Sequence, residues 1–305
     1  MRFTMTYPMM ARPYAAELLT GAGVGRLARA AEDAGFDGFG FTDHPAPTHR
    51  WLQAGGHDAL DPFAALSFVA AVTANLRLIP NIVVLPYRNP FIVAKACATL
   101  DALSGGRFTL AVGTGYLKGE YAALGVDYEA RNELFDEAIA VIKGVWATDD
   151  FAFEGRSFSA RGQSANPKPA HVPIWVGGNS RLSRRRVAAI GNGWAPFPAP
   201  RGMAATTKTP ALETVGDLQA MLDDLWYLVE AAGRDPRSID VVFGSPVGGA
   251  PGDAGFDATS QIAALDDLVR RGVTWATVTI PGDSIDHAVD AIGRYGDLVI
   301  GPMRG

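Results

Sequence analysis

A carboxylate and an imidazole stand side by side at Asp43 and His44, directly after the apolar run 39–42. Histidine is the side chain best suited to exchange a proton near neutral pH, and a neighbouring carboxylate can orient its ring. Pro45 and Pro47 prevent the chain from continuing as a helix. We therefore expect His44 to handle a proton and Asp43 to orient it. The alternative is that Asp43 hydrogen-bonds the backbone of the proline-rich loop while His44 is merely exposed.

Two glycine-containing turns could bring the backbone close to a ligand. In the segment GTG, Thr114 offers a hydroxyl beside Gly115. In IWVGGNS, Gly177 and Gly178 precede Asn179 and the expected start of a helix, where free N–H groups and the helix dipole favour an anion. We expect a phosphate at this second turn. An empty tight turn is the alternative reading of both.

A third candidate segment is the long strand expected at 76–85, which Pro80 interrupts. Proline inside a central strand usually marks a bulge. A bulge near the end of a strand can turn backbone N–H groups toward a ligand. The alternative is an irregular strand end that binds nothing.

The sequence lacks the motifs that are typical of several other functional classes. No GxSxG motif supports a serine hydrolase. The five histidines show no HxH or HxxxH spacing and no cysteine partner, so no metal site is predicted. A net charge of −5 argues against nucleic-acid binding, and no apolar run approaches the length of a membrane span. With no signal peptide pattern at the N-terminus, we expect a cytoplasmic protein.

A recurring phrase indicates the fold: an apolar helical stretch, a stop that contains glycine, and a short β-rich run. It occurs five times, for example at 100–112 and 268–280. Glycine suits the left-handed residue that ends a helix, and repeated helix-to-strand steps imply a parallel sheet. Eight strands are predicted, at about 2–7, 38–42, 76–85, 107–112, 174–176, 193–196, 238–243 and 275–280.

Eight such units predict a (β/α)₈ TIM barrel with insertion segments, and we expect residues 1–305 to form one domain. A doubly wound open sheet is less favoured because no GxGxxG follows the first strand. The segment 148–171 precedes a strand, and we expect a small hairpin there. The long connections that follow strands, on the face where barrel enzymes carry their sites, are 43–60, 114–130, 196–214 and 245–257.

The joint order of several stretches resembles the bacterial luciferase-like family, and within it the branch that uses the deazaflavin coenzyme F420. The LSGGR block with its following GTG and the EYAALG segment is the most specific part. The matching stretches are AGFDGFGFTDH (34–44), LDPFAALSFVAAVTANLRL (60–78), the run from VVLPYRNPF to VIKGVW (83–146), NPKPAHVPIWVGGNS (166–180) and GNGW (191–194).

This resemblance implies a role for each candidate segment. His44, with Asp43 beside it, would contact the coenzyme ring. A non-prolyl cis peptide within 81–84 would support the ring, which makes Asn81, Ile82 and Val83 candidate cofactor-binding residues. The coenzyme phosphate would be held by hydroxyl and backbone groups at Thr114, Gly115, Gly177, Gly178 and Asn179.

One departure from the family bears on the substrate. Sugar-phosphate dehydrogenases of this branch have Glu after the GTG turn, where this chain has Tyr116, so glucose-6-phosphate oxidation is not expected. Tyr116 becomes a substrate-facing candidate, and Glu120, one helical turn later, could take the place of the missing Glu. Trp51, Trp194 and Phe197 are expected to supply further aromatic walls.

The resemblance leads us to expect an F420-dependent oxidoreductase that acts on a small organic molecule and forms a homodimer. Two alternatives stay open. The same barrel could use reduced FMN and oxygen as a monooxygenase, or it could bind a flavin without catalysis. An intact Asp43-His44 pair favours catalysis over the second alternative.

Overall fold

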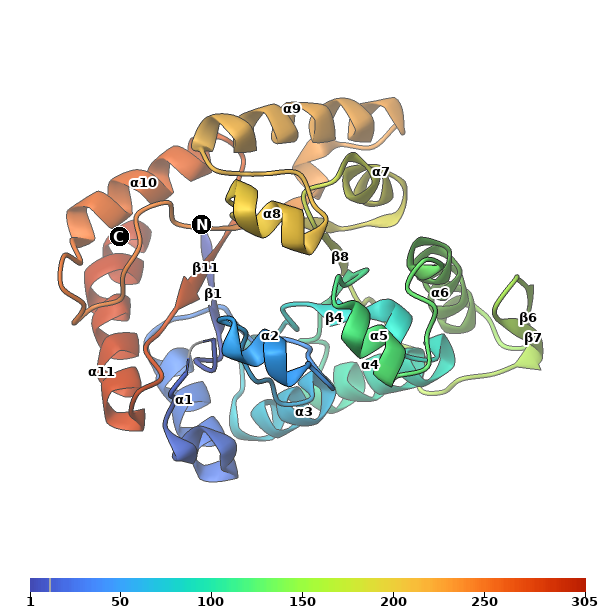
Figure 1. Ribbon diagram of the computed structural model, residues 1–305, viewed down its shortest axis with the longest axis horizontal. Helices are drawn as coiled ribbons and strands as arrows, with labels where there is room; N and C mark the ends of the chain where they lie inside the picture. The colour runs from blue at the N-terminus through green and yellow to red at the C-terminus, as the bar shows by residue number, and fades with distance from the viewer. Residues whose placement is uncertain (11) are drawn as a thin grey trace.

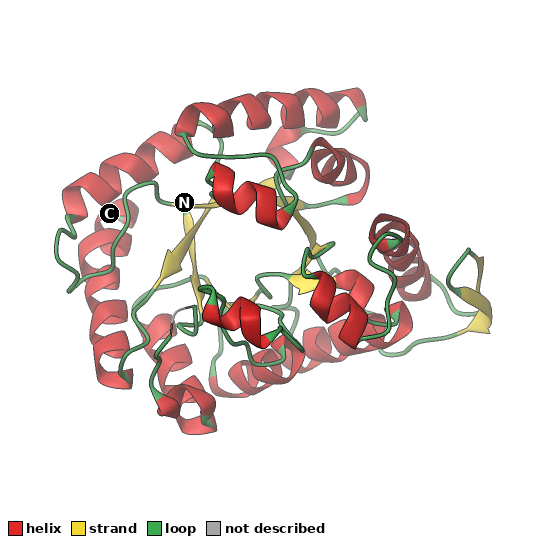
Figure 2. Ribbon diagram, in the orientation of Figure 1, coloured by secondary structure: helices red, strands yellow, loops and turns green. Residues whose placement is uncertain are grey.

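The computed structural model describes residues 1–10 and 12–305. Parallel strands form a ring that helices surround, as Figure 2 shows. The strands follow the neighbour order β3-β2-β1-β11-β10-β9-β8-β5-β4. Their bounds are β1 Arg2–Thr6, β2 Gly38–Gly40, β3 Arg77–Leu78, β4 Val83–Val84, β5 Leu110–Gly113, β8 Ile174–Gly177, β9 Gly193–Ala195, β10 Asp240–Gly244 and β11 Trp275–Thr279.

Strands β3 and β4 are two halves of the single strand predicted at 76–85. The first half pairs with β2 through Leu78, and the second pairs with β5 through Val83. Leu78 also forms a parallel bridge to Phe108, just before β5, and this bridge closes the ring. The fold is therefore the predicted (β/α)₈ TIM barrel, with the third strand interrupted around Pro80.

Long helices cover the outside of the barrel, and short helices lie in the connections over its carboxyl end (Figure 1). The outer helices are α1 Gly21–Asp33, α3 Pro62–Val72, α4 Pro90–Ser104, α6 Arg131–Ala147, α7 Arg181–Ile190, α9 Val215–Ala231, α10 Ala258–Arg270 and α11 Ile285–Tyr295. The short ones are α2 His49–Gln53, α5 Lys118–Ala123 and α8 Arg201–Thr207. The remaining elements are α12 Gly301–Arg304, the 3₁₀ turns η1 Ala16–Leu19, η2 Leu85–Tyr87 and η3 Pro236–Ser238, and the π-helical η4 Gly296–Ile300.

The local signals for helix ends are confirmed. Asp61 and Asn89 each accept backbone N–H groups at the start of α3 and α4, with proline at the first helical position. Gly105 ends α4 in the left-handed conformation at φ 69°. Among the helices of residues 1–10 and 12–305, none is long and apolar enough to cross a bilayer.

The hairpin expected within 148–171 is also confirmed. Strands β6 (Phe151–Glu154) and β7 (Ser159–Gln163) pair antiparallel. They lie between α6 and β8, in a helix-to-strand connection at the periphery of Figure 1. The hairpin is therefore remote from the carboxyl ends of the strands.

Two tryptophans fill the inside of the barrel. The rings of Trp175 and Trp275 meet edge to face at 5.3 Å, and they pack with Ile79 and Ala111. Edge-to-face contact is a favoured arrangement for buried aromatic rings. This layer lies beneath a space that residues at the carboxyl ends of the strands surround.

Candidate active site

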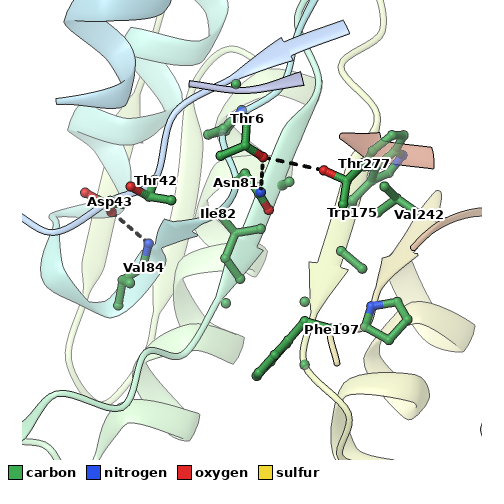
Figure 3. Close-up of a pocket in the computed structure, with 18 of the residues that line it drawn as sticks. Thr6, Thr42, Asp43, Asn81, Ile82, Val84, Trp175, Phe197, Val242 and Thr277 are labelled. Carbon is green, nitrogen blue, oxygen red and sulfur yellow. Dashed lines mark hydrogen bonds between the residues drawn. The ribbon is translucent and has the colours of Figure 1, made fainter. Parts of the chain in front are cut away.

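A cavity of about 440 Å³ occupies that space. Its volume lies within the roughly 300–1,000 Å³ that is usual for small-molecule sites. All eight strands of the barrel, or the loops after them, contribute wall residues, including Thr6, His44 and Gly244. Figure 3 shows Asn81 and Ile82 on one wall, with Trp175 and Phe197 on another.

Asp43 has a different partner from the one expected. It is 3% exposed, and its carboxylate accepts hydrogen bonds from both terminal nitrogens of Arg88, at 2.6 and 2.8 Å. The same carboxylate accepts the Val84 N–H at 2.8 Å (Figure 3). Burial lowers the pKa of Arg88, but these hydrogen bonds and the charge of Asp43 outweigh it, so the pKa is raised. Asp43 thus fixes the end of β4 instead of orienting His44.

The carboxylate that contacts His44 is Glu120. Its Oε2 lies 3.2 Å from His44 Nδ1, and it also accepts the Tyr87 hydroxyl at 3.0 Å. Its Oε1 accepts the Ala46 N–H at 3.2 Å. Because both oxygens of Glu120 already act as acceptors for Tyr87 and Ala46, we assign His44 Nδ1 as the donor, which leaves Nε2 as the other ring nitrogen of this cavity-lining residue. Since Glu120 is completely buried, it supports His44 and does not face a substrate, contrary to our expectation.

Tyr87 completes this carboxylate site from the segment η2 Leu85–Tyr87. Burial, and then the charge of Glu120, raise the pKa of the Tyr87 hydroxyl well above its usual range. The hydroxyl therefore stays protonated and donates to Glu120 at all ordinary pH values. The Nδ1 side of the His44 ring is therefore held by Glu120 and Tyr87, both of which are buried.

Aromatic rings hold the other faces of His44. Trp51 lies with its ring centroid 4.6 Å from that of His44, and His57 meets His44 edge to face at 4.9 Å. Trp51 was expected to be a pocket wall; it packs against His44 and His57 instead of lining the cavity. Burial lowers the pKa of His57, and the hydrogen bond between its Nδ1 and the Asp58 carbonyl offsets only part of this.

The interrupted strand reaches into the cavity as predicted. A non-prolyl cis peptide joins Asn81 to Ile82, within the expected range. Asn81 Nδ2 donates to Thr6 Oγ1 at 2.9 Å, and both residues line the cavity. Val83, in contrast, is completely buried in the hydrophobic core, so it is not a cofactor contact.

Glycines make room for the Ile82 side chain. A Cβ added at Gly113 would lie 2.3 Å from Ile82 Cδ1, and one added at Gly177 would lie 2.4 Å away. Real Cβ atoms do not approach this closely, so glycine is required at both positions unless Ile82 moves. The apolar surface of Ile82 is thereby presented to the cavity between two strand ends.

The predicted anion turn lines the same cavity. Thr114 and Gly115 lie on one side, and Gly177 and Gly178 lead into the N-terminus of α7 on the other. Asn179 departs from the prediction. It is completely buried, its Nδ2 donates to the carbonyls of Phe197 and Pro210, and its own N–H donates to Thr209. Asn179 therefore positions the 197–210 loop and is not itself a cradle residue.

Three arginines of α7 are engaged elsewhere. Arg181 and Arg184 both bind Asp224, and Arg186 binds Asp136. In the described part of the chain, the one Lys or Arg side chain lining the cavity is Lys208, at the end of α8. Positive charge at this turn comes from Lys208 and from the helix N-terminus.

The remaining aromatic candidates fall into two groups, those that line the cavity and one that is buried behind it. Tyr116 and Phe197 line the cavity as predicted. Burial, and then the charge of Glu120, raise the pKa of Tyr116. Trp194 is completely buried on the helix side of β9, where its Nε1 donates to the Gly178 carbonyl. It supports the glycine turn from behind and is not a wall of the cavity.

Sequence reasoning missed His57, Tyr87 and Arg88 as parts of the site. His57 follows a short helix inside a long connection, where no periodic pattern fixes its direction. Tyr87 and Arg88 stand directly before the Asn89 cap, in a segment interpreted only as a strand end. The signal that could have found Arg88 is the buried Asp43 itself, because a buried carboxylate requires a cationic partner or several donors.

Comparison with known proteins agrees with this architecture. Residues 1–265 match the sequence model of the luciferase-like monooxygenase family, so the chain belongs to that family. Members of the family are oxidoreductases and monooxygenases. The cavity with its His44 site is thus the candidate active site of this family member.

Among curated relatives, an uncharacterised protein of Mycobacterium bovis is 32% identical over 181 residues, which cover 55% of this chain and 62% of that protein. An F420-dependent glucose-6-phosphate dehydrogenase of Beutenbergia cavernae is 34% identical over 211 residues, covering 63% of this chain and 60% of the relative. An FMNH2-dependent dimethylsulfone monooxygenase of Pseudomonas putida is 30% identical over 172 residues, covering 54% of this chain and 46% of the relative. The matches therefore span less than two thirds of the length of these relatives.

Solved structures share the fold over the full chain. The monooxygenase RslO1 of Streptomyces bottropensis superposes with a TM-score of 0.81 at 18% identity, covering 100% of both chains. The F420-dependent tetrahydromethanopterin reductase of Methanopyrus kandleri gives 0.73 at 17% identity, covering 99% of both chains. Both likenesses extend the barrel assignment beyond residue 265.

Proposed function

We propose that this protein is an F420-dependent oxidoreductase that moves a hydride between the deazaflavin coenzyme and a small organic substrate. The observation that carries the proposal is the cavity in which a His44 imidazole, held by buried Glu120, faces a glycine-lined anion turn across a space large enough for the coenzyme ring. The 34% identity to an F420-dependent dehydrogenase supports this coenzyme.

The residues present fit such a coenzyme. A flat ring needs a smooth apolar surface. Gly113 and Gly177 leave room for the Ile82 side chain and Gly115 for Val84, and both side chains line the cavity. A phosphate needs donors and positive potential, which Thr114, the N-terminus of α7 and Lys208 supply. When bound, the deazaflavin supplies the hydride chemistry.

The chain itself would bind, orient and manage one proton. Ile82 supports the apolar ring, and the turn at Gly177 and Gly178 holds the phosphate. His44 Nε2 would take up the hydroxyl proton when hydride leaves a hydroxyl-bearing carbon, and would return a proton to the oxygen when hydride adds to a carbonyl carbon. Glu120 keeps the opposite nitrogen protonated and stabilises the imidazolium that forms when His44 takes up a proton. The Tyr116 hydroxyl, protonated because its pKa is raised, lines the space for the substrate.

A second candidate is a monooxygenase that uses reduced FMN. The 30% identity to an FMNH2-dependent enzyme favours it, and the phosphate turn suits either coenzyme. We also propose a single domain over 1–305 that forms a cytoplasmic homodimer, on the family resemblance stated above. Size-exclusion chromatography with light scattering tests the dimer.

Equilibrium titration of the purified protein with F420 and with FMN, followed by fluorescence quenching, tests the proposal. We expect saturable binding of F420 and weaker binding of FMN. Tight binding of FMN without any binding of F420 would overturn the choice of coenzyme. Thr114→Val should weaken F420 binding, while Thr206→Val, on the exposed side of α8, should leave it unchanged.

A further inference from the structure

A second chamber of about 520 Å³ lies beside the coenzyme cavity. The two share wall residues Met10, Pro198, Gly244 and Thr277. The second chamber lies at the ends of β10, β11 and β1, beneath the connection 245–257. It is therefore adjacent to the reaction space but on the side away from the anion turn at Gly177.

The walls of this chamber are mostly apolar. Val247 and Ala250 come from the 245–257 connection, and Val278, Ile280 and Tyr295 come from β11, the segment after it and α11. Among the described residues that line it, none is Lys, Arg or His. The one acidic residue, Asp253, lies at the exposed rim, where its Oδ2 accepts the Ala250 N–H at 2.7 Å.

One buried polar side chain in the wall lacks a partner for its oxygen. Gln261, on α10, is 2% exposed and lines the chamber. Its Nε2 donates to the carbonyls of Val247 at 2.6 Å and Gly248 at 3.2 Å, which fixes the orientation of the amide. Its Oε1 is buried and accepts no hydrogen bond from a described residue. Less than 1 Å² of this oxygen is accessible, so it does not open into the chamber, and the Gln261 amide serves to hold the 247–248 backbone in place.

The Tyr295 hydroxyl offers a second polar group in the same wall. Tyr295 is 2% exposed and lines the chamber. Ser245, Thr277 and Thr279 add hydroxyl groups to the mainly apolar walls, and a few polar atoms in an apolar wall are the usual pattern of a small-molecule site.

We propose that this chamber binds the body of the substrate: an uncharged, mainly apolar molecule that carries at most a hydroxyl or amide group. The role of the occupant as substrate rests on the proposed function, whereas its binding does not. An anion is disfavoured because no cation lines the chamber among the described residues, and the desolvation of a charge would go uncompensated.

The test uses three probes of equal chain length: 1-hexanol, hexanoate and hexylamine. Binding to the full chain is measured by saturation-transfer NMR, with and without F420. We expect 1-hexanol to bind about tenfold more tightly than either charged probe. Equal or tighter binding of hexanoate or hexylamine would overturn the assignment of an uncharged ligand.

Variants locate the binding. Val247→Phe fills the chamber without touching the coenzyme cavity and should weaken 1-hexanol binding about tenfold. Val269→Phe makes the same change at a surface position on α10 and should have no effect. Unaltered 1-hexanol binding by folded Val247→Phe would contradict the proposal.

The same measurements separate the two proposals. Failure of F420 to bind the wild-type protein, with 1-hexanol binding still sensitive to Val247→Phe, would overturn the proposed function alone. Displacement of 1-hexanol by F420 would show that the coenzyme occupies the chamber and would overturn this inference. Simultaneous binding of F420 and 1-hexanol supports both.

Discussion

His44 Nδ1 and Glu120 Oε2 lie 3.2 Å apart although 76 positions separate the two residues in the chain. Strand β2 delivers the imidazole, and α5 delivers the carboxylate across the mouth of the barrel. Glu120→Ala should therefore shift His44 away from the Nδ1–H tautomer, as read by ¹⁵N NMR of the imidazole. Turnover should fall by about tenfold to a hundredfold with little change in F420 affinity.

Tyr87→Phe is the matched control for Glu120, because it removes one donor to the carboxylate and leaves the hydrogen bond between His44 and Glu120 in place. We expect this variant to lose about 1 kcal/mol of unfolding free energy and to retain the wild-type tautomer. A tautomer unchanged in Glu120→Ala would show that the carboxylate does not position His44.

We expect Asp43 to contribute mainly to the stability of the fold and less to turnover. Asp43→Ala removes the main partner of Arg88, whose side chain is 18% exposed, and leaves the Val84 N–H without an acceptor. Breaking such a pair should lower the free energy of unfolding by about 3 kcal/mol in urea denaturation. In the double variant with Arg88→Met the loss should be smaller than the sum of the single losses. If the losses of unfolding free energy in the two single variants simply added up in the double variant, Asp43 and Arg88 would not be energetically coupled.

Acid should destabilise the protein through His57. Because burial holds its folded-state pKa below the ordinary value, the unfolded chain takes up this proton first as pH falls. Stability from neutral His57 is complete above about pH 6.5 and declines below it, by at most about 1.4 kcal/mol per pH unit. Denaturation at several pH values should show that the free energy of unfolding declines less steeply below about pH 6.5 in His57→Gln than in the wild type. Parallel curves for the two proteins would count against this role.

The glycine cradle around Ile82 can be tested by rescue. Gly177→Ala places a methyl group 2.4 Å from Ile82 Cδ1, so it should weaken F420 binding about tenfold. Ile82→Val removes that Cδ1 and should restore part of the affinity in the double variant. Gly293→Ala, at a helical position with nothing within 4 Å of the added Cβ, should bind as the wild type does. Absence of rescue would mean that Ile82 does not set the width of the cavity.

Much of the fold could be predicted from local signals. Glycine stops, Asp-Pro and Asn-Pro helix starts and apolar strand runs are encoded within a few residues, and they fixed both the barrel and the face that carries the site. The hydrogen bond between His44 and Glu120 was not predicted because it depends on how two separate connections fold toward each other. Asp43 was assigned to its neighbour His44, whereas its real partner, Arg88, enters from the next strand.

Side-chain direction accounts for the other departures. Successive residues of a strand point to opposite faces. Ala195 lines the cavity, so the preceding residue of β9, Trp194, points to the opposite face, toward the helices. Ile82 and Val84 line the cavity by the same alternation, and Val83 faces the core. The sequence shows that alternate residues of a strand point to opposite faces. It does not show which of the two sets points into the barrel, because that depends on how the strands pair.

The structure of the protein with F420 bound tests the central claim most directly. We predict the deazaflavin ring in the 440 Å³ cavity against Ile82, within hydrogen-bonding distance of His44 Nε2, and the phosphate at Gly177 and Gly178. A coenzyme bound outside this cavity, or a His44 imidazole that points away from the ring and is no longer hydrogen-bonded to Glu120, would contradict the account.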